Sequence, residues 1–116
     1  MWSMKTRSAK AKGKRLAQAV AFKLLEWAKD LSPDDIKVPP TSVPGEDIWL
    51  SPKARERYPF AIEAKNTERV QIWQAMQQAR EHAKGTDYKP IVVFSRNREV
   101  EPLVCLSLQD LLWLMS

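Results

Sequence analysis

The segment Phe60-Ala61-Ile62-Glu63-Ala64-Lys65 decides the fold expected for this chain, together with the earlier stretch Pro44-Gly45-Glu46-Asp47-Ile48. Apolar and charged residues alternate in the first segment, and this two-residue period predicts a strand over 60–65. Phe60, Ile62 and Ala64 then point to the core, while Glu63 and Lys65 share the other face. Residues 47–50 are expected to form another strand, which pairs with 60–63 as an antiparallel hairpin centred on Arg55.

This hairpin would place Asp47 directly opposite Glu63. Two carboxylates and the Lys65 ammonium then converge at one point, which suits a divalent cation held beside a phosphodiester. A lone Glu-x-Lys motif is more often an incidental charge pair on an exposed strand. The metal-site hypothesis therefore depends on Asp47 lying opposite that motif.

The rest of the chain alternates between helical and extended patterns. We expect helices over 10–29, 67–84 and 108–115, and further strands over 36–38, 90–95 and 102–106. Thr67 and Ser107 are the expected caps of the later helices, Gly85 stops the middle one, and 51–59 is expected to be a polar connection. The order predicts an α/β fold with a mixed five-stranded sheet flanked by helices (α-β-β-β-α-β-β-α), in which 60–65 and 90–95 are parallel neighbours.

The composition favours one folded domain over residues 1–116, with 1–9 as a flexible basic tail. Hydrophobic residues make up 44% of the 116 positions, enough for a modest core. The chain has one cysteine and one histidine, which exclude an intrachain disulfide and a Cys/His zinc site. No apolar run approaches membrane-spanning length and no signal-peptide pattern is present, so we expect a cytoplasmic protein without a membrane partner.

Positive charge is concentrated near the start of the chain. The net charge is +5, and residues 1–29 carry eight Lys or Arg against one Glu. Lys10, Lys12, Lys14 and Arg15 fall in the first turns of the expected helix, where they oppose its dipole. Contact with a nucleic-acid backbone explains such a cluster, although a basic terminus is often only a solvated tail.

At this point the chain resembles the PD-(D/E)XK nuclease superfamily, and within it the small Holliday-junction resolvases of archaea and phages. The residues that carry the resemblance are Lys12-Gly13, Pro44-Gly45-Glu46-Asp47-Ile48, Glu63-Ala64-Lys65-Asn66, and the helix through Gln71 and Trp73. The resemblance covers nearly the whole chain. It implies a restriction-endonuclease-like fold, Mg²⁺ with Mn²⁺ as a substitute, branched DNA as substrate, and a homodimer without a small-molecule cofactor. It also suggests a phage protein of DNA recombination that acts in the cytoplasm of a bacterial host.

The resemblance assigns roles to individual residues. Asp47, Glu63 and Lys65 would be catalytic, and Asp47, Glu63 and the backbone carbonyl of Ala64 would hold the metal. Such resolvases usually carry a glutamate where this chain has Ala17, so Gln18 is considered as a substitute ligand. Further accessory candidates near phosphate or water are Ser42, Asn66 and Gln71, with plain turn or capping roles as the alternative.

Three other residues are expected to stay outside the site. Glu46 should point away from the metal into solvent, and His82 should face solvent or the helix C-terminal dipole. Trp49 is expected to pack against the first helix, with stacking on an unpaired base as the alternative.

Three functions remain open from the sequence. The first is a metal-dependent endonuclease that resolves four-way junctions by phosphodiester hydrolysis. The second is another PD-(D/E)XK endonuclease, acting on flaps or other branches or by nicking. The third is a non-catalytic DNA-binding module with the same fold, which the missing helix-one glutamate favours and the retained acids oppose.

Overall fold

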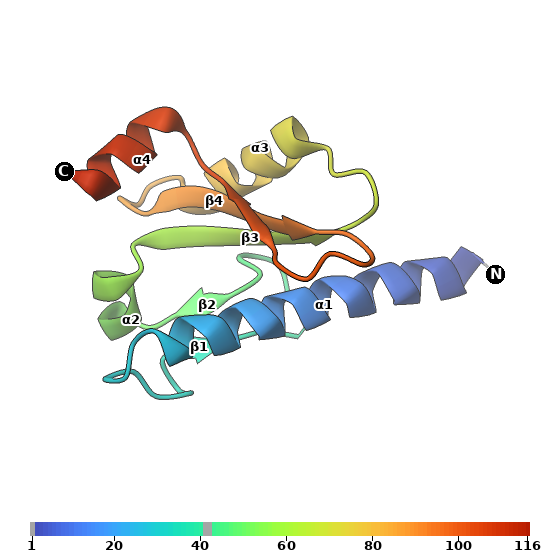
Figure 1. Ribbon diagram of the computed structural model, residues 1–116, viewed down its shortest axis with the longest axis horizontal. Helices are drawn as coiled ribbons and strands as arrows, with labels where there is room; N and C mark the ends of the chain where they lie inside the picture. Colours follow the sequence, from blue (N-terminus) through green and yellow to red (C-terminus); the bar gives the residue numbers. More distant parts are fainter. Residues whose placement is uncertain (1, 41–42) are drawn as a thin grey trace.

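The computed structural model describes residues 2–40 and 43–116. The described chain contains four helices and five strands (Figure 1). In chain order these are α1 (Trp2–Glu26), β1 (Ile36–Lys37), β2 (Trp49–Leu50), α2 (Pro52–Arg57), β3 (Phe60–Asn66), α3 (Ile72–Ala83), β4 (Lys89–Ser95), β5 (Leu103–Cys105) and α4 (Leu108–Met115).

The strands form two separate sheets, so the prediction of one five-stranded sheet was wrong. β1 and β2 make an antiparallel pair, and β3, β4 and β5 form a three-stranded sheet in that order. β3 and β4 are parallel, as expected for strands joined through a helix, whereas β4 and β5 are antiparallel. The α/β class and the mixed sheet are confirmed.

The expected hairpin between 47–50 and 60–63 does not form. β2 pairs with β1 through Ile36 and Leu50, and the connection to β3 is occupied by α2. The sequence carried a signal for this helix, because Ser51 followed by Pro52 is a favoured N-cap and first position. The Ser51 hydroxyl accepts a hydrogen bond from the Ala54 amide at 3.1 Å.

The central strand β3 is covered on both faces. α1 contacts one face and α3 the other, so β3 lies between two helical layers (Figure 1). Ile62 and Ala64 belong to the core shared with Leu16, Ala17 and Ala21 of α1. A smaller core forms on the other side of the sheet between α3 and β4, around Ala75, Met76, Ala79 and Val92. Continuous burial of residues 61–64 follows from this double coverage.

Helix ends differ from the sequence predictions at two places. α1 begins at Trp2 rather than near Lys10, so residues 2–9, expected to be a flexible tail, are helical. No glycine or proline interrupts this stretch, and its Lys, Arg, Met and Ala residues favour helix. α3 begins at Ile72 rather than Thr67, with Gln71 as its N-cap. The Thr67 amide instead continues the strand pairing, bonding to the Ser95 carbonyl at 3.2 Å.

The segment of α2 holds the C-terminal end of α1. Tyr58 donates its hydroxyl proton to the Leu24 carbonyl at 2.6 Å, and Arg57 donates to the Trp27 carbonyl at 3.1 Å. Lys53 reaches the Asp30 carbonyl at 2.9 Å. The Leu24 carbonyl is among those that a helix end leaves without partners, and Trp27 and Asp30 follow α1, so these donors hold the end of α1 and the segment after it.

The last helix was predicted correctly in both bounds and cap. Ser107 caps α4 by accepting a hydrogen bond from the Asp110 amide at 3.1 Å. No α4 residue is buried, although the helix is strongly apolar. None of the described helices is long and apolar enough to cross a membrane.

Ile48 anchors the segment that follows the proline-rich loop. Its side chain is fully buried in the α1–β3 core. We predict that Ile48→Ala lowers the free energy of unfolding by about 2–5 kcal/mol, because it leaves a cavity that the core cannot refill. Urea denaturation measures this loss. The control is Trp49→Ala, whose side chain is largely exposed and whose loss should cost less than about 1 kcal/mol. Equal losses in both variants would contradict the burial of Ile48.

Candidate metal and phosphate site

The site is built on the free edge of β3. Because β3 is the end strand of its sheet, one edge faces away from β4 and is open to other backbone groups. The Asp47 amide donates to the Ile62 carbonyl at 3.2 Å, and the Asp47 carboxylate accepts from the Ala64 amide at 2.8 Å. Asp47 therefore lies against β3, although no hairpin forms.

The geometry of an extended strand also places the Ala64 carbonyl. The amide and carbonyl of one strand residue point to the same side of the strand. Since the Ala64 amide bonds to Asp47, its carbonyl oxygen lies on the same free edge. The three oxygen donors predicted for a metal, from Asp47, Glu63 and Ala64, thus come from one short stretch of this edge.

Glu63 is a buried carboxylate with charged neighbours. Its Oε2 lies 3.3 Å from the Lys65 Nζ, and its side chain is 7% exposed. The pKa of Glu63 is raised to about 7, first because burial disfavours its charge and then because the Asp47 carboxylate is near. The Lys65 ammonium opposes this shift. The two carboxylates therefore crowd each other in a poorly hydrated place.

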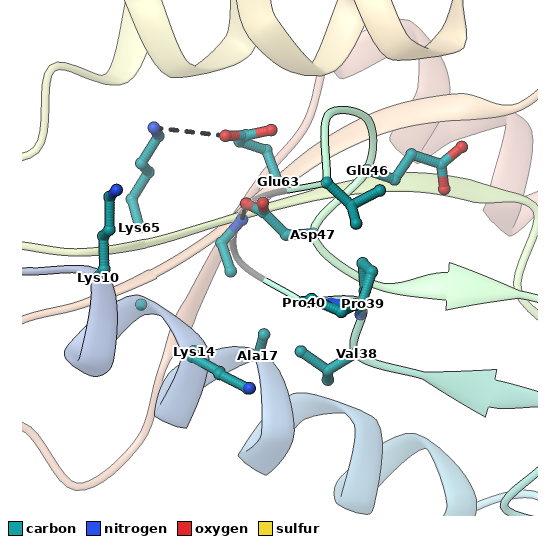
Figure 2. Close-up of a pocket in the computed structure, with 13 residues that line it drawn as sticks. Lys10, Lys14, Ala17, Val38, Pro39, Pro40, Glu46, Asp47, Glu63 and Lys65 are labelled. Carbon is teal, nitrogen blue, oxygen red and sulfur yellow. Dashed lines mark hydrogen bonds and ion pairs between the residues drawn. The ribbon is translucent and has the colours of Figure 1, made fainter.

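A cleft of about 250 Å³ opens beside these groups (Figure 2). Its walls come from α1, from the loop after β1 and from β3, with Lys10, Lys14, Asp47, Glu63 and Lys65 among the lining residues. Figure 2 shows Asp47 between α1 and β3, next to Glu63, with the Lys65 side chain beside them. A cleft that combines three acidic residues, Glu46 among them, with three lysines suits an anionic ligand bound together with a cation.

The other predicted residues divide between the cleft and its surroundings. Gln18 is exposed on α1 and does not line the cleft, whereas Ala17 does. Gln71 lines a smaller depression of about 190 Å³, which Lys65 shares. Asn66 lies against α1, with its amide nitrogen 3.5 Å from the Lys12 carbonyl. Because Gln18 does not line the cleft, it is not positioned to replace the missing helix-one glutamate.

Other residues predicted to contact DNA or phosphate lie away from the cleft or outside the described chain. Lys12 and Arg15 do not line the cleft, and Arg15 is exposed on α1. Ser42, expected near phosphate or water, lies outside the described residues.

Glu46 was expected to lie outside the site and in solvent, but it lines the cleft and is partly buried. Its carboxylate accepts two hydrogen bonds from the Arg55 guanidinium, at 2.8 and 3.1 Å, in a partly buried pair. Arg55 also stacks over the Tyr88 ring, 3.9 Å from its centroid. Glu46 thus fixes the segment that carries Asp47.

Trp49 does not pack against α1. Its side chain is 45% exposed, and it lines a recess of about 460 Å³ that shares Val38, Pro39, Pro40 and Val43 with the lining of the cleft. The alternation along the segment explains this, because Ile48 and Leu50 are buried on either side of Trp49.

Sequence reasoning missed His82. Its Nδ1 atom lies 3.4 Å from the Glu63 Oε1. A signal was available, because His82 lies between Ala79 and Ala83, both on the buried side of α3. Its contact with Glu63 required the placement of α3 over β3, which a single sequence does not give.

The donor set fits a hard divalent cation. No three His, Cys, Asp or Glu side chains in residues 2–40 and 43–116 gather closely enough to form a metal site by themselves. Asp47 and Glu63 supply two carboxylates and Ala64 a carbonyl, which is the all-oxygen, partly hydrated type of site that Mg²⁺ prefers. A cation there would also offset the repulsion that raises the pKa of Glu63.

The raised pKa of Glu63 predicts how stability depends on pH. The folded chain binds this proton more tightly than the unfolded chain, whose glutamate pKa is 4.5. Stability in EDTA should therefore fall as pH rises from about 4.5 to about 7 and stay low above it. We predict that Glu63→Gln lacks this decline and is more stable than the wild type at pH 8, by up to about 2 kcal/mol. Urea denaturation from pH 5 to 8 measures it, and parallel curves would contradict the burial of the charge.

Searches of known protein families, of curated proteins and of solved structures found no match to this chain.

Proposed function

We propose that this protein is a metal-dependent endonuclease that cuts structured DNA, with a four-way junction as its best-suited substrate. The observation that carries the proposal is the Asp47 carboxylate bonded to the Ala64 amide beside the Glu63–Lys65 pair. This arrangement matches the metal and catalytic residues that the resemblance to PD-(D/E)XK resolvases implies. A binding module has no need to crowd two acids beside a phosphate site.

The residues of the cleft divide the chemical work. Asp47, Glu63 and the Ala64 carbonyl would hold Mg²⁺, which when bound polarises a phosphate and lowers the pKa of water. The Lys65 ammonium is partly exposed next to Glu63, where it can stabilise the negative charge that develops on the phosphate. Lys10 and Lys14 line the opposite wall and are placed to attract the DNA backbone.

The three lysines that line the cleft favour contacts to phosphate. Backbone contacts by lysine carry no sequence information, so we propose recognition of DNA shape rather than of sequence. This supports a structure-selective enzyme over a sequence-specific one. The same active-site residues would serve a flap or nicking endonuclease, and the arrangement of two copies separates these functions.

The C-terminal segment supports a two-fold dimer. Eight apolar side chains from Leu103 to Met115 are at least 38% exposed: Leu103, Val104, Leu108, Leu111, Leu112, Trp113, Leu114 and Met115. We call these residues the C-terminal apolar surface. Asp110 is the one charged residue between Leu103 and Ser116. An exposed apolar surface of this kind is typical of a protein–protein interface. A dimer formed through it would have the two active sites that symmetric junction cutting needs.

The proposed function predicts the effect of changing a cation ligand. Asp47→Asn keeps the size of the side chain and an oxygen for the Ala64 amide but removes a charge. We expect cleavage of a synthetic four-way junction in Mg²⁺ to fall at least about 100-fold, since a lost metal interaction is worth several kcal/mol. Junction binding, measured by gel shift in Ca²⁺, should persist or tighten.

The matched control is Asp34→Asn, the same chemical change at a highly exposed carboxylate. It should cut as the wild type does. Full activity of Asp47→Asn would refute the metal site. A linear duplex and a flap, tested in parallel, distinguish junction resolution from the other nuclease activities, and wild-type binding without any cutting would favour the non-catalytic module.

The second prediction concerns the dimer. Leu112→Glu places a charge on the C-terminal apolar surface, and we expect it to shift the protein from dimer to monomer in sedimentation velocity. Val100→Glu is the control, because Val100 is almost fully exposed and lies outside that surface. A wild type that sediments as a monomer would rule out this interface and favour a nicking or flap enzyme.

A further inference from the structure

The contact between His82 and Glu63 joins a proposed metal ligand to a histidine that the proposed chemistry does not use. The Nδ1 atom of His82 and the Oε1 atom of Glu63 are buried and lie 3.4 Å apart. Among the described residues, neither atom has a hydrogen-bond partner within ordinary geometry. A buried carboxylate oxygen without a hydrogen-bond donor costs free energy, so we expect His82 to donate a hydrogen bond to Glu63.

The packing of α3 explains why the imidazole reaches the strand. Ala79 and Ala83 are buried against the sheet, and their small side chains let α3 approach closely. His82 lies between them in sequence, and its ring is 28% exposed while Nδ1 itself is covered. The ring therefore closes the α3 side of Glu63 and excludes water from Oε1.

The two oxygens of Glu63 face different surroundings. Oε2 lies 3.3 Å from the Lys65 ammonium, whereas Oε1 lies 3.4 Å from His82 Nδ1. Rotation about the last bond of the side chain would exchange them or turn both away from the cleft. A donor fixed at Oε1 stops this rotation, and such donors to ligating groups are worth about 10- to 100-fold in metal affinity.

We propose that His82 is a positioning residue, whose Nδ1–H donates a hydrogen bond to Oε1 of Glu63 and so holds Oε2 toward the cleft for a divalent cation. The inference rests on the metal site of the proposed function. The observed separation is slightly longer than an ordinary N–H···O bond, and a small rotation of either side chain closes it. A neutral imidazole can donate from Nδ1, so the bond does not require a charged ring.

The first test uses the fact that His82 is the only histidine of the chain. In full-length protein labelled with ¹⁵N-histidine, at pH 8 with Mg²⁺, the two ring nitrogens report one residue. A neutral ring with the proton on Nδ1 is the expected result. A proton on Nε2, leaving Nδ1 bare, would overturn the inference without any substitution.

The second test measures binding of Mn²⁺ to the protein alone by electron paramagnetic resonance, at fixed pH and without DNA. His82→Leu fills similar space without a donor and should weaken Mn²⁺ binding by about 10- to 100-fold. His82→Asn places an amide nitrogen near the position of Nδ1 and should recover much of the affinity. A purely structural role would give no such recovery.

The controls are Gln77→Leu and Gln77→Asn, which make the same changes at an exposed position of α3. Both should bind Mn²⁺ as the wild type does. Wild-type affinity in a folded His82→Leu would overturn the role of His82 alone. If the wild type binds no Mn²⁺, the metal site of the proposed function fails as well. Should His82→Leu not fold, the tautomer of the wild type decides.

Discussion

The hydrogen bond from the Ala64 amide to the Asp47 carboxylate is the constraint on which the site depends. β3 is an edge strand, and its free amides and carbonyls need partners that its own sheet does not provide. The Asp47 segment supplies them through one backbone and one side-chain contact. A carboxylate is thereby fixed beside a second acid without a continuous ladder between the two sheets. The buried Ile48 and the Glu46–Arg55 pair hold this segment from either side.

The crowding of Asp47 and Glu63 lowers the stability of the folded protein but suits the binding of a cation. Glu63 is buried near Asp47, and both the burial and that neighbouring carboxylate raise its pKa, so a negative charge on Glu63 is disfavoured. Natural proteins retain such conflicts mainly where function needs them. An ion pair with Lys65 relieves part of the repulsion, yet it leaves one carboxylate oxygen facing an imidazole. The crowded acids, rather than the shape of the cleft, make the strongest argument for a bound cation.

The sequence predicted those elements whose signals are local. The bounds of α4 followed from Ser107 and a short apolar run, and the end of α3 followed from Gly85, whose φ of 81° suits glycine. The extent of β3 followed from alternation and that of β4 from a nearly continuous apolar run, and their parallel pairing followed from the helix between them. Asp47, Glu63 and Lys65 meet as expected, but by a different route, because pairing of β2 with β1 competes with the predicted hairpin.

The features that were missed depend on contacts between distant segments. No hydrophobic periodicity in the sequence indicates the division into two sheets or the contact of His82 with Glu63. Trp73 is 79% exposed on α3, since Ala75, Met76 and Ala79 already fill the face toward β4. Which apolar residues of a helix are covered thus depends on the neighbouring strand.

The bonds from Lys53, Arg57 and Tyr58 to the end of α1 have a mechanical consequence. They restrain the helix at its C-terminal end, while Lys10 and Lys14 lie toward the other end, on the wall of the cleft. A tilt of α1 about this anchored end would displace Lys10 farther than Lys14, and Lys14 farther than Ala17, because displacement grows with distance from the pivot. The cleft would therefore widen most at the rim lined by Lys10 and least at the wall formed by Ala17.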